Sequence, residues 1–273
     1  MILHGGPGLP DYLGDVASMI EDLAPVFRYD QRATGRSPWQ GRHTSSRHVS
    51  DLAELLDLWE APTAVLIGHS YGTDLACRFC LAHPDRVAAM LLMAGPFVGD
   101  WRAGDRLARS RRMSAAQQNR YRQLDELPHR TEDQELEWLT LGWFTDHFDP
   151  GRGWSWAAEA ARERSPINYT MNGELGKERR TDPLDLHLDE LSARLPPQVE
   201  ILGSVGDPRP LSARITGGPA RRSADPDRWR RTRTMARAAG RRARPPAEVC
   251  ARKRRSVRGP YPAQLRVHGP ARG

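Results

Sequence analysis

Along the first two hundred residues, apolar side chains either form compact runs or recur at helical spacing. Compact apolar runs at 63–68, 87–94 and 199–202 are typical of strands covered on both faces, and residues 26–30 predict one further short strand. Residues 44–59 carry apolar side chains at helical spacing, and residues 11–23 and 71–83 predict additional helices. The pattern therefore predicts an α/β fold with a mostly parallel sheet and flanking helices.

The strand signal disappears between the second and third of those apolar runs. Helical stretches rich in Arg, Glu and Trp take over, which indicates an inserted α-helical cap. We therefore expect a first core part at 1–96, a cap at 97–197, a core strand with an acid-bearing loop at 198–213, and an Arg/Pro/Gly-rich tail at 214–273.

Charge divides the chain unevenly. Residues 214–273 contain 17 Arg, one Lys and three acidic residues, a net charge of +15, so that residues 1–213 carry −8 of the overall +7. The tail also has little apolar content, and we expect it to be disordered. The first 213 residues thus predict an acidic globular body with a basic appendage.

Three cysteines make no disulfide framework and favour a reducing, cytoplasmic setting. Cys77 and Cys80 fall on a predicted helix with no second ligand pair nearby, so we interpret them as buried helix residues rather than a redox or zinc motif. No secretory signal or membrane span is visible. We expect neither a metal ion nor an organic cofactor.

The strongest chemical signal is Gly68-His69-Ser70-Tyr71-Gly72, which matches G-x-S-x-G between a predicted strand and a predicted helix. That context is the one a nucleophile elbow requires, because a sharp turn lifts the Ser hydroxyl above the sheet. Ser70 is therefore the candidate catalytic nucleophile.

A second signal, His4-Gly5-Gly6-Pro7-Gly8, lies near the start. Backbone N–H groups in such a turn can point at a reacting carbonyl, and Gly6 with Tyr71 would supply the two donors of an oxyanion hole. We interpret His4 as a structural residue of this turn rather than a general base.

Together with Asp30-Gln31-Arg32-Ala33-Thr34-Gly35-Arg36-Ser37, these motifs resemble the proline iminopeptidase-like serine hydrolases of the α/β-hydrolase fold, over residues 1 to about 213. Ala33 replaces a usual glycine of that family. The resemblance implies a Ser nucleophile, an acid after a later strand, a His after the last strand, and a helical cap over the site. Asp207 matches the place of the acid.

Two features of the cap stay open at this point. Glu174 is a candidate for binding a free substrate amine, as acidic cap residues do in the family, although a solvated helix charge is the alternative. The tryptophans could line an apolar pocket or simply pack; they are Trp138, Trp143, Trp154 and Trp156.

The catalytic histidine is missing from its expected place. After Asp207 the sequence contains only His268, which we interpret as a tail residue. Read from the second base of each codon, residues 229–239 can spell G-A-G-H-E-P-W-L-E-R-P, in which Gly and Trp are forced. This resembles the family's histidine loop, with the His falling at Thr232 and Arg233. We therefore hypothesise that the tail is translated out of frame.

Only three residues precede His4, so the first strands are expected to be incomplete, like the C-terminal end of the sheet. The leading prediction is a serine hydrolase releasing an N-terminal residue from a small peptide, with the missing His leaving open whether the chain is active. A second possibility is an esterase or related acyl hydrolase, and a third is a non-catalytic protein that binds nucleic acid or acidic surfaces through its tail. We favour a small-molecule or short-peptide substrate over nucleic acid and membrane; the sequence leaves oligomeric state unknown.

Overall fold

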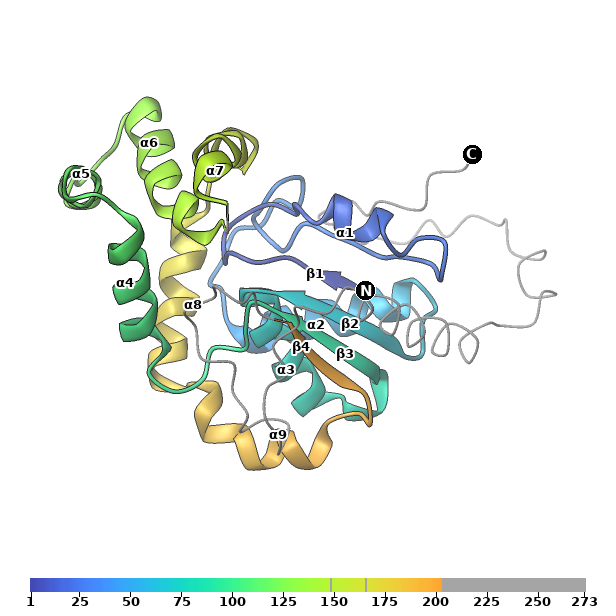
Figure 1. Ribbon diagram of the computed structural model, residues 1–273. Helices are drawn as coiled ribbons and strands as arrows, with labels where there is room; N and C mark the ends of the chain where they lie inside the picture. The colour runs from blue at the N-terminus through green and yellow to red at the C-terminus, as the bar shows by residue number, and fades with distance from the viewer. Residues whose placement is uncertain (148, 165, 203–273) are drawn as a thin grey trace.

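A parallel sheet organises the part of the chain that the computed structural model describes, residues 1–147, 149–164 and 166–202. Within those residues it contains β1 (Ile2–Leu3), β2 (Ala64–His69), β3 (Val87–Met93) and β4 (Val199–Leu202), in that spatial order. The strands are in register so that Ile2, Ile67, Leu91 and Glu200 form one row across the sheet. Figure 1 shows the described strands side by side.

The two faces of the sheet are covered by different helices. Leu66, Met90 and Leu92 pack into a large cluster with α2 (Ser45–Leu58), α3 (Tyr71–Ala82) and α9 (Leu188–Arg194). Ile67 and Leu91 point the other way, toward α1 (Gly14–Ser18). Successive strand residues thus serve opposite faces, which is the period of two expected of a strand covered on both sides.

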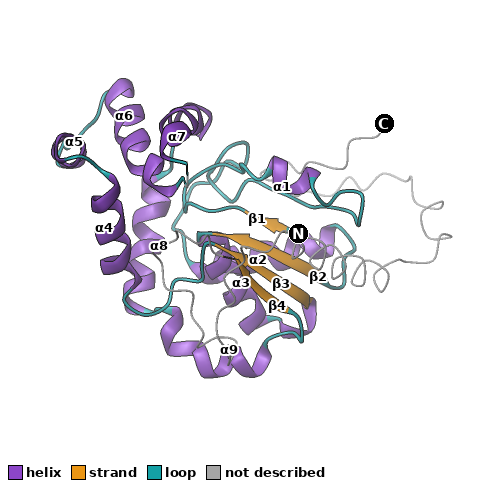
Figure 2. Cartoon of the chain, in the orientation of Figure 1, coloured by secondary structure: helices purple, strands orange, loops and turns teal. Residues whose placement is uncertain are grey.

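A group of helices lies beside the carboxyl ends of the strands (Figures 1 and 2). It comprises α4 (Trp101–Arg112), α5 (Ala115–Asp125), α6 (Glu132–Trp143), α7 (Pro150–Arg164) and α8 (Tyr169–Thr181), and no strand interrupts it within the described residues. Met171 and Leu175 of α8 pack on Tyr71, the first residue of α3. The cap therefore meets the core directly at the G-x-S-x-G turn.

Short 3-10 turns complete the chain path: η1 (Pro84–Arg86) before β3, η2 (Phe144–Asp146) between α6 and α7, and η3 (Leu184–His187) before α9. Leu184 and Leu191, at the end of the cap sequence, are buried in the large core cluster. This final stretch therefore packs with the sheet layer.

The structure confirms the predicted strands at 63–68, 87–94 and 199–202 and the helices at 44–59 and 71–83, within a residue or two at each end. Two predictions were wrong. Residues 26–30 form no continuous strand: only Arg28 makes a β-bridge, and Ile2 N–H donates to Phe27 O at 2.9 Å beside the two-residue β1. The helix expected at 11–23 is regular only over Gly14–Ser18 and then loosens into turns.

Cys77 and Cys80 are fully buried free thiols on α3, as predicted. Burial raises the pKa of Cys80 to about 11, so the thiol stays protonated at neutral pH. No helix among the described residues has the length and apolar character that crossing a membrane requires.

Candidate active site

Ser70 stands at a sharp turn between β2 and α3. Its backbone has φ 52° and ψ −121°, a conformation that residues with a side chain rarely adopt, and its N–H donates to Met93 O at 2.9 Å. The residue is half-buried. The strand–turn–helix context predicted for the motif is confirmed.

The two glycines of the motif are required by close packing. A Cβ on Gly68 would lie 2.5 Å from Gly72 O, and one on Gly72 would lie 2.1 Å from Leu3 O. No side chain fits at either position without moving backbone. The tight turn that exposes Ser70 thus depends on both glycines.

The glycine-rich turn at residues 4–8 lies against Ser70. A Cβ on Gly5 would come within 2.9 Å of Ser70 Cβ, so the two backbones are in contact. Gly5 N–H donates to the Tyr12 hydroxyl at 3.1 Å, which leaves the N–H of Gly6 as the predicted donor of this turn. The N–H of Tyr71, at the first position of α3, has no acceptor within its own helix.

His4 is held as part of this turn. Its Nδ1 lies 2.8 Å from Gly5 O, and its Nε2 accepts the N–H of Gln31 at 3.0 Å. Burial lowers the pKa of His4, which favours the neutral ring with its proton on Nδ1. With both ring nitrogens engaged, His4 is a structural residue, as the sequence suggested.

Tyr12 contacts the same turn, and Arg164 lies over the Tyr12 ring. The sequence indicated neither residue. The Tyr12 hydroxyl lies 2.6 Å from Nδ1 of His69, and the Arg164 guanidinium covers the Tyr12 ring at 4.2 Å. Burial raises the pKa of Tyr12 to about 12, so the hydroxyl remains protonated. Tyr12 sits where a helix was expected, and nothing in its local sequence indicates its contact with the active-site turn.

The loop of residues 30–37 is hydrogen-bonded both to the turn at residues 4–8 and to the cap. Arg32 and Asp51 form a buried ion pair, with Nε of Arg32 2.6 Å from Asp51 Oδ2 and the guanidinium 4.0 Å from the Trp39 ring. Ala33 adopts φ 59°, the left-handed conformation that explains why glycine is usual there. Its carbonyl accepts a 3.0 Å hydrogen bond from Asn168 of the cap.

Two buried histidines extend this polar support. His43 Nδ1 lies 3.3 Å from His48 Nε2, and the His48 ring meets the Tyr71 ring edge-on at 6.3 Å between centroids. Burial, then His43 and Arg32, lowers the pKa of His48 to about 3. Burial also lowers the pKa of His43, so both rings are neutral at neutral pH.

Glu174 connects cap and core. Its carboxylate accepts the backbone N–H of His43 at 2.8 Å, and the side chain is half-buried. Glu178, one turn further along α8, accepts the N–H of Ser45 at 2.9 Å in the same way. The Glu174 carboxylate thus holds α8 against the backbone of His43. Its role in binding a substrate amine stays a prediction.

Several predicted residues lie outside the described part of the chain. They are Asp207, His268 and the segment of Thr232 and Arg233. The rings of four described histidines, His4, His43, His48 and His187, are hydrogen-bonded to residues other than Ser70. Among the described residues, no cluster of three or more His, Cys, Asp or Glu could hold a metal ion.

The cap tryptophans differ in their surroundings. Trp138 stacks on Tyr121 at 5.8 Å and lies under Arg130, whereas Trp154 and Trp156 are 42% and 39% exposed. Trp143 lies 5.6 Å from the Arg164 guanidinium, which also covers Tyr12. Packing accounts for Trp138, and Trp143 is the tryptophan of the four that approaches the active-site turn through Arg164.

Residues 1–182, two thirds of the chain, match the family described as alpha/beta hydrolase fold. The chain is a member of the α/β-hydrolase family. The elbow at Ser70, the parallel sheet and the helices beside its carboxyl ends are therefore the family's architecture in this protein.

Curated relatives match over short segments. Lipase LipV of Mycobacterium tuberculosis is 41% identical over 69 residues, covering 25% of this chain and 26% of the lipase. A proline iminopeptidase of Heyndrickxia coagulans is 34% identical over 95 residues, which is 33% of each protein. The chain thus spans about a quarter to a third of the length of these relatives.

Solved structures show the same fold over most of the chain. A hydrolase from Pseudomonas aeruginosa PA01 superposes with a TM-score of 0.57 and 18% identity, covering 87% of this chain and 86% of that one. A proline iminopeptidase-related protein from Thermus thermophilus gives 0.52 and 20% identity over 88% of both. At these identities the likeness concerns the fold.

Proposed function

We propose that this α/β-hydrolase is a serine hydrolase in which Ser70 attacks the acyl carbon of a small peptide and releases its N-terminal residue. The observation that carries the proposal is the elbow itself: Ser70 at φ 52°, with two glycines that admit no side chain and the residue 4–8 turn in contact with it. Such a turn holds a hydroxyl exposed while backbone N–H groups face the same point.

The chemistry would proceed in two steps. Ser70 Oγ forms a bond to the acyl carbon while its proton passes to a base; the C–N bond then breaks, and the amine leaves with that proton. Water hydrolyses the acyl-enzyme in the second step. The N–H groups of Gly6 and Tyr71 would stabilise the negative charge on the carbonyl oxygen.

The base and its acid belong to the part of the chain after Leu202. Asp207 is our candidate for the acid that orients the base, and the family's histidine would follow it. If the tail is read out of frame, the chain as written has the nucleophile without its base. Most of the rate would then be lost, because the triad members act as a unit.

An acyl ester is the second candidate substrate, favoured by the 41% identity to a lipase over a 69-residue segment. The two can be separated by measuring hydrolysis of proline β-naphthylamide against p-nitrophenyl butyrate. Peptide release predicts a preference for the amide with a free amine, and Glu174→Gln should then raise KM for that substrate alone.

The direct test is labelling of the full chain with a fluorophosphonate probe, followed by peptide mapping. Labelling should occur on Ser70 and vanish in Ser70→Ala, while Ser155→Ala, which replaces an exposed serine of α7, should label as the unchanged protein does. Labelling that survives Ser70→Ala, or no labelling of the unchanged chain after prolonged exposure, would overturn the proposal for this polypeptide.

A further inference from the structure

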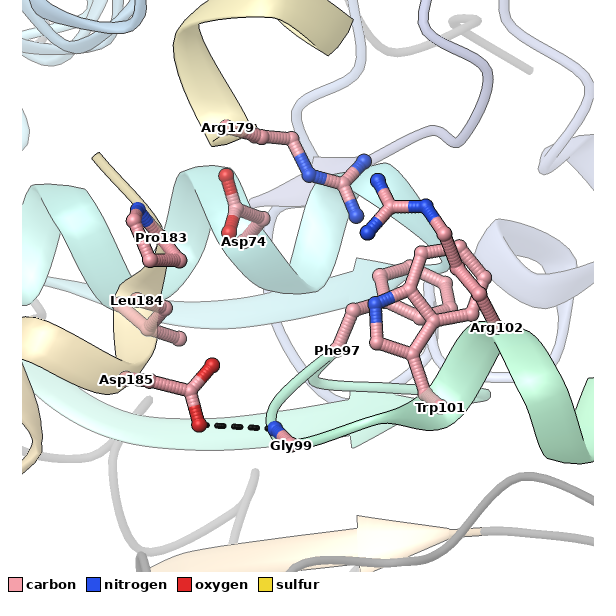
Figure 3. A pocket seen from close by; sticks show the side chains of 9 residues that line it. All are labelled: Asp74, Phe97, Gly99, Trp101, Arg102, Arg179, Pro183, Leu184 and Asp185. Carbon is pink, nitrogen blue, oxygen red and sulfur yellow. Dashed lines mark hydrogen bonds between the residues drawn. The ribbon is translucent and has the colours of Figure 1, made fainter. Parts of the chain in front are cut away.

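A small open pocket of about 60 Å³ lies between the core and the cap, beside α3. Its walls include Asp74 of α3, Phe97 from the loop after β3, Trp101 and Arg102 at the start of α4, and Arg179 near the end of α8. Figure 3 shows these side chains around the pocket.

Arg102 and Arg179 line one side of this pocket. Figure 3 shows the guanidinium groups of Arg102 and Arg179 facing one another above the rings of Phe97 and Trp101. The guanidinium carbon of Arg102 lies 4.5 Å from the Trp101 ring centroid, and that of Arg179 lies 5.7 Å from the same ring. Two separate helices therefore bring two positive charges to one indole.

Within residues 1–147, 149–164 and 166–202, no ion pair involves Arg102 or Arg179. Of the two carboxylates in the lining, Asp74 pairs with Arg78 at 3.2 Å, and Asp185 accepts the N–H of Gly99 at 2.7 Å and keeps its negative charge. The positive charge of the lining is thus concentrated on the side of Arg102 and Arg179.

The electrostatics agree with this geometry. Burial, followed by the positive charges of Arg179, Arg180 and Arg106, lowers the pKa of Arg102, and Asp100 only partly offsets them. Facing like charges raise the free energy of the empty site, and an anion between them would remove that cost. A planar guanidinium also presents paired donors that match a carboxylate or phosphate.

We propose that Arg102 and Arg179 form a binding site for the carboxylate or phosphate group of a small ligand whose flat apolar part lies against Trp101 and Phe97. The site would hold the anionic group by hydrogen bonds from two helices and the rest of the ligand by ring contact. Binding itself does not require a reactive Ser70.

The position of the pocket links it to the active site. Asp74 follows Ser70 by four residues on α3, about 6 Å along the helix axis. A Cβ on Gly95 would lie 2.2 Å from Thr73 Oγ1, so the loop that leads to Phe97 runs along the first turn of α3. The substrate would therefore carry an acidic group beside its scissile bond, a statement that rests on the proposed hydrolase function.

The test is isothermal titration of the full chain with benzoate and with phenyl phosphate, using benzamide as the neutral analogue. Arg102→Gln and Arg179→Gln should each weaken anion binding about tenfold, the value of one charge-assisted hydrogen bond, and the double variant should abolish it. Lys177→Gln and Arg111→Gln remove exposed positive charges from the same two helices, and they should leave binding within about twofold.

Tighter binding of benzoate would assign a carboxylate ligand, and tighter binding of phenyl phosphate a phosphate ligand; both outcomes support the site. Equal binding of benzamide and benzoate, an undiminished affinity in the double variant, or an equal loss in Lys177→Gln would overturn it. Circular dichroism melting of each variant separates a lost contact from a lost fold.

Ser70→Ala should bind these anions as tightly as the unchanged chain does. If fluorophosphonate labelling fails while anion binding is intact, the hydrolase function falls and the anion site stands. If labelling succeeds and neither Arg variant changes anion binding, the hydrolase function stands and the anion site falls.

Discussion

Substitutions at Ala33 test the left-handed backbone conformation of the loop at residues 30–37. Its φ of 59° places an L-residue in the left-handed region, which costs about 1–2 kcal/mol relative to glycine. Ala33→Gly would release that cost. It would also lose about 0.7 kcal/mol through the greater freedom of glycine in the unfolded chain, and about 0.4 kcal/mol from a half-buried methyl group.

The net expectation for Ala33→Gly is a gain of about 0.5 kcal/mol in the free energy of unfolding. Ala33→Val should lose about 1 kcal/mol or more, because a β-branched side chain is worse still in this conformation. The order of stability at position 33 is thus Gly, then Ala, then Val. Urea unfolding followed by circular dichroism measures it, provided that the slope with denaturant is the same in all three proteins.

Ala103 is the matched control, since it is exposed on α4 with helical backbone. There Ala should be most stable, with Val about 0.6 and Gly about 0.9 kcal/mol worse. The reasoning would be refuted if Ala33→Gly destabilised the protein as Ala103→Gly does, because position 33 would then lack the left-handed conformation. Ser70 labelling should be the same in Ala33→Gly as in the unchanged chain.

Gly72→Ala should lower the free energy of unfolding by about 3 kcal/mol or more, because its Cβ would meet Leu3 O. Gly173→Ala, with open space around the position in α8, should raise the free energy of unfolding by about 0.8 kcal/mol. Urea unfolding measures both. His48 is neutral in the fold with a pKa of about 3, so stability is complete above about pH 6.5, the unfolded value, and falls as the pH drops toward 3. The loss should reach about 3 kcal/mol by pH 4.5 in pH-dependent unfolding, and His48→Gln should flatten the slope. A chain carrying the shifted reading of residues 229–239, in which Thr232→His supplies the base, should label at Ser70 about a thousandfold faster with the fluorophosphonate.

Equal effects of Gly72→Ala and Gly173→Ala would show that the clash at the elbow is absent. An unchanged slope in His48→Gln, or a flattened one in the exposed control His129→Gln, would contradict the role of His48. Equal labelling by the shifted chain and its Thr232→Ala counterpart would contradict the shifted reading, as would a gene sequence whose bases do not spell that loop.

Local pattern was enough to predict three strands, the two long core helices and the sharp turn at Ser70. Each of these depends on residues close together in sequence: a run of apolar side chains, a helical spacing, or glycines flanking Ser70. The strand expected at residues 26–30 did not form, because it depends on pairing with a segment distant in sequence. Its formation depends on a neighbouring strand, and β1 has only two residues.

The contacts that only the tertiary structure decided join distant segments. His4 is clamped by Gln31, Glu174 binds the backbone of His43, and Arg102 faces Arg179 across a pocket formed by separate helices. Nothing in the local sequence around an arginine or a glutamate distinguishes a solvated charge from one held over a tryptophan or against a backbone N–H. Which of the two occurs depends on how the cap packs on the sheet, and that is set by burial of apolar surface over the whole domain.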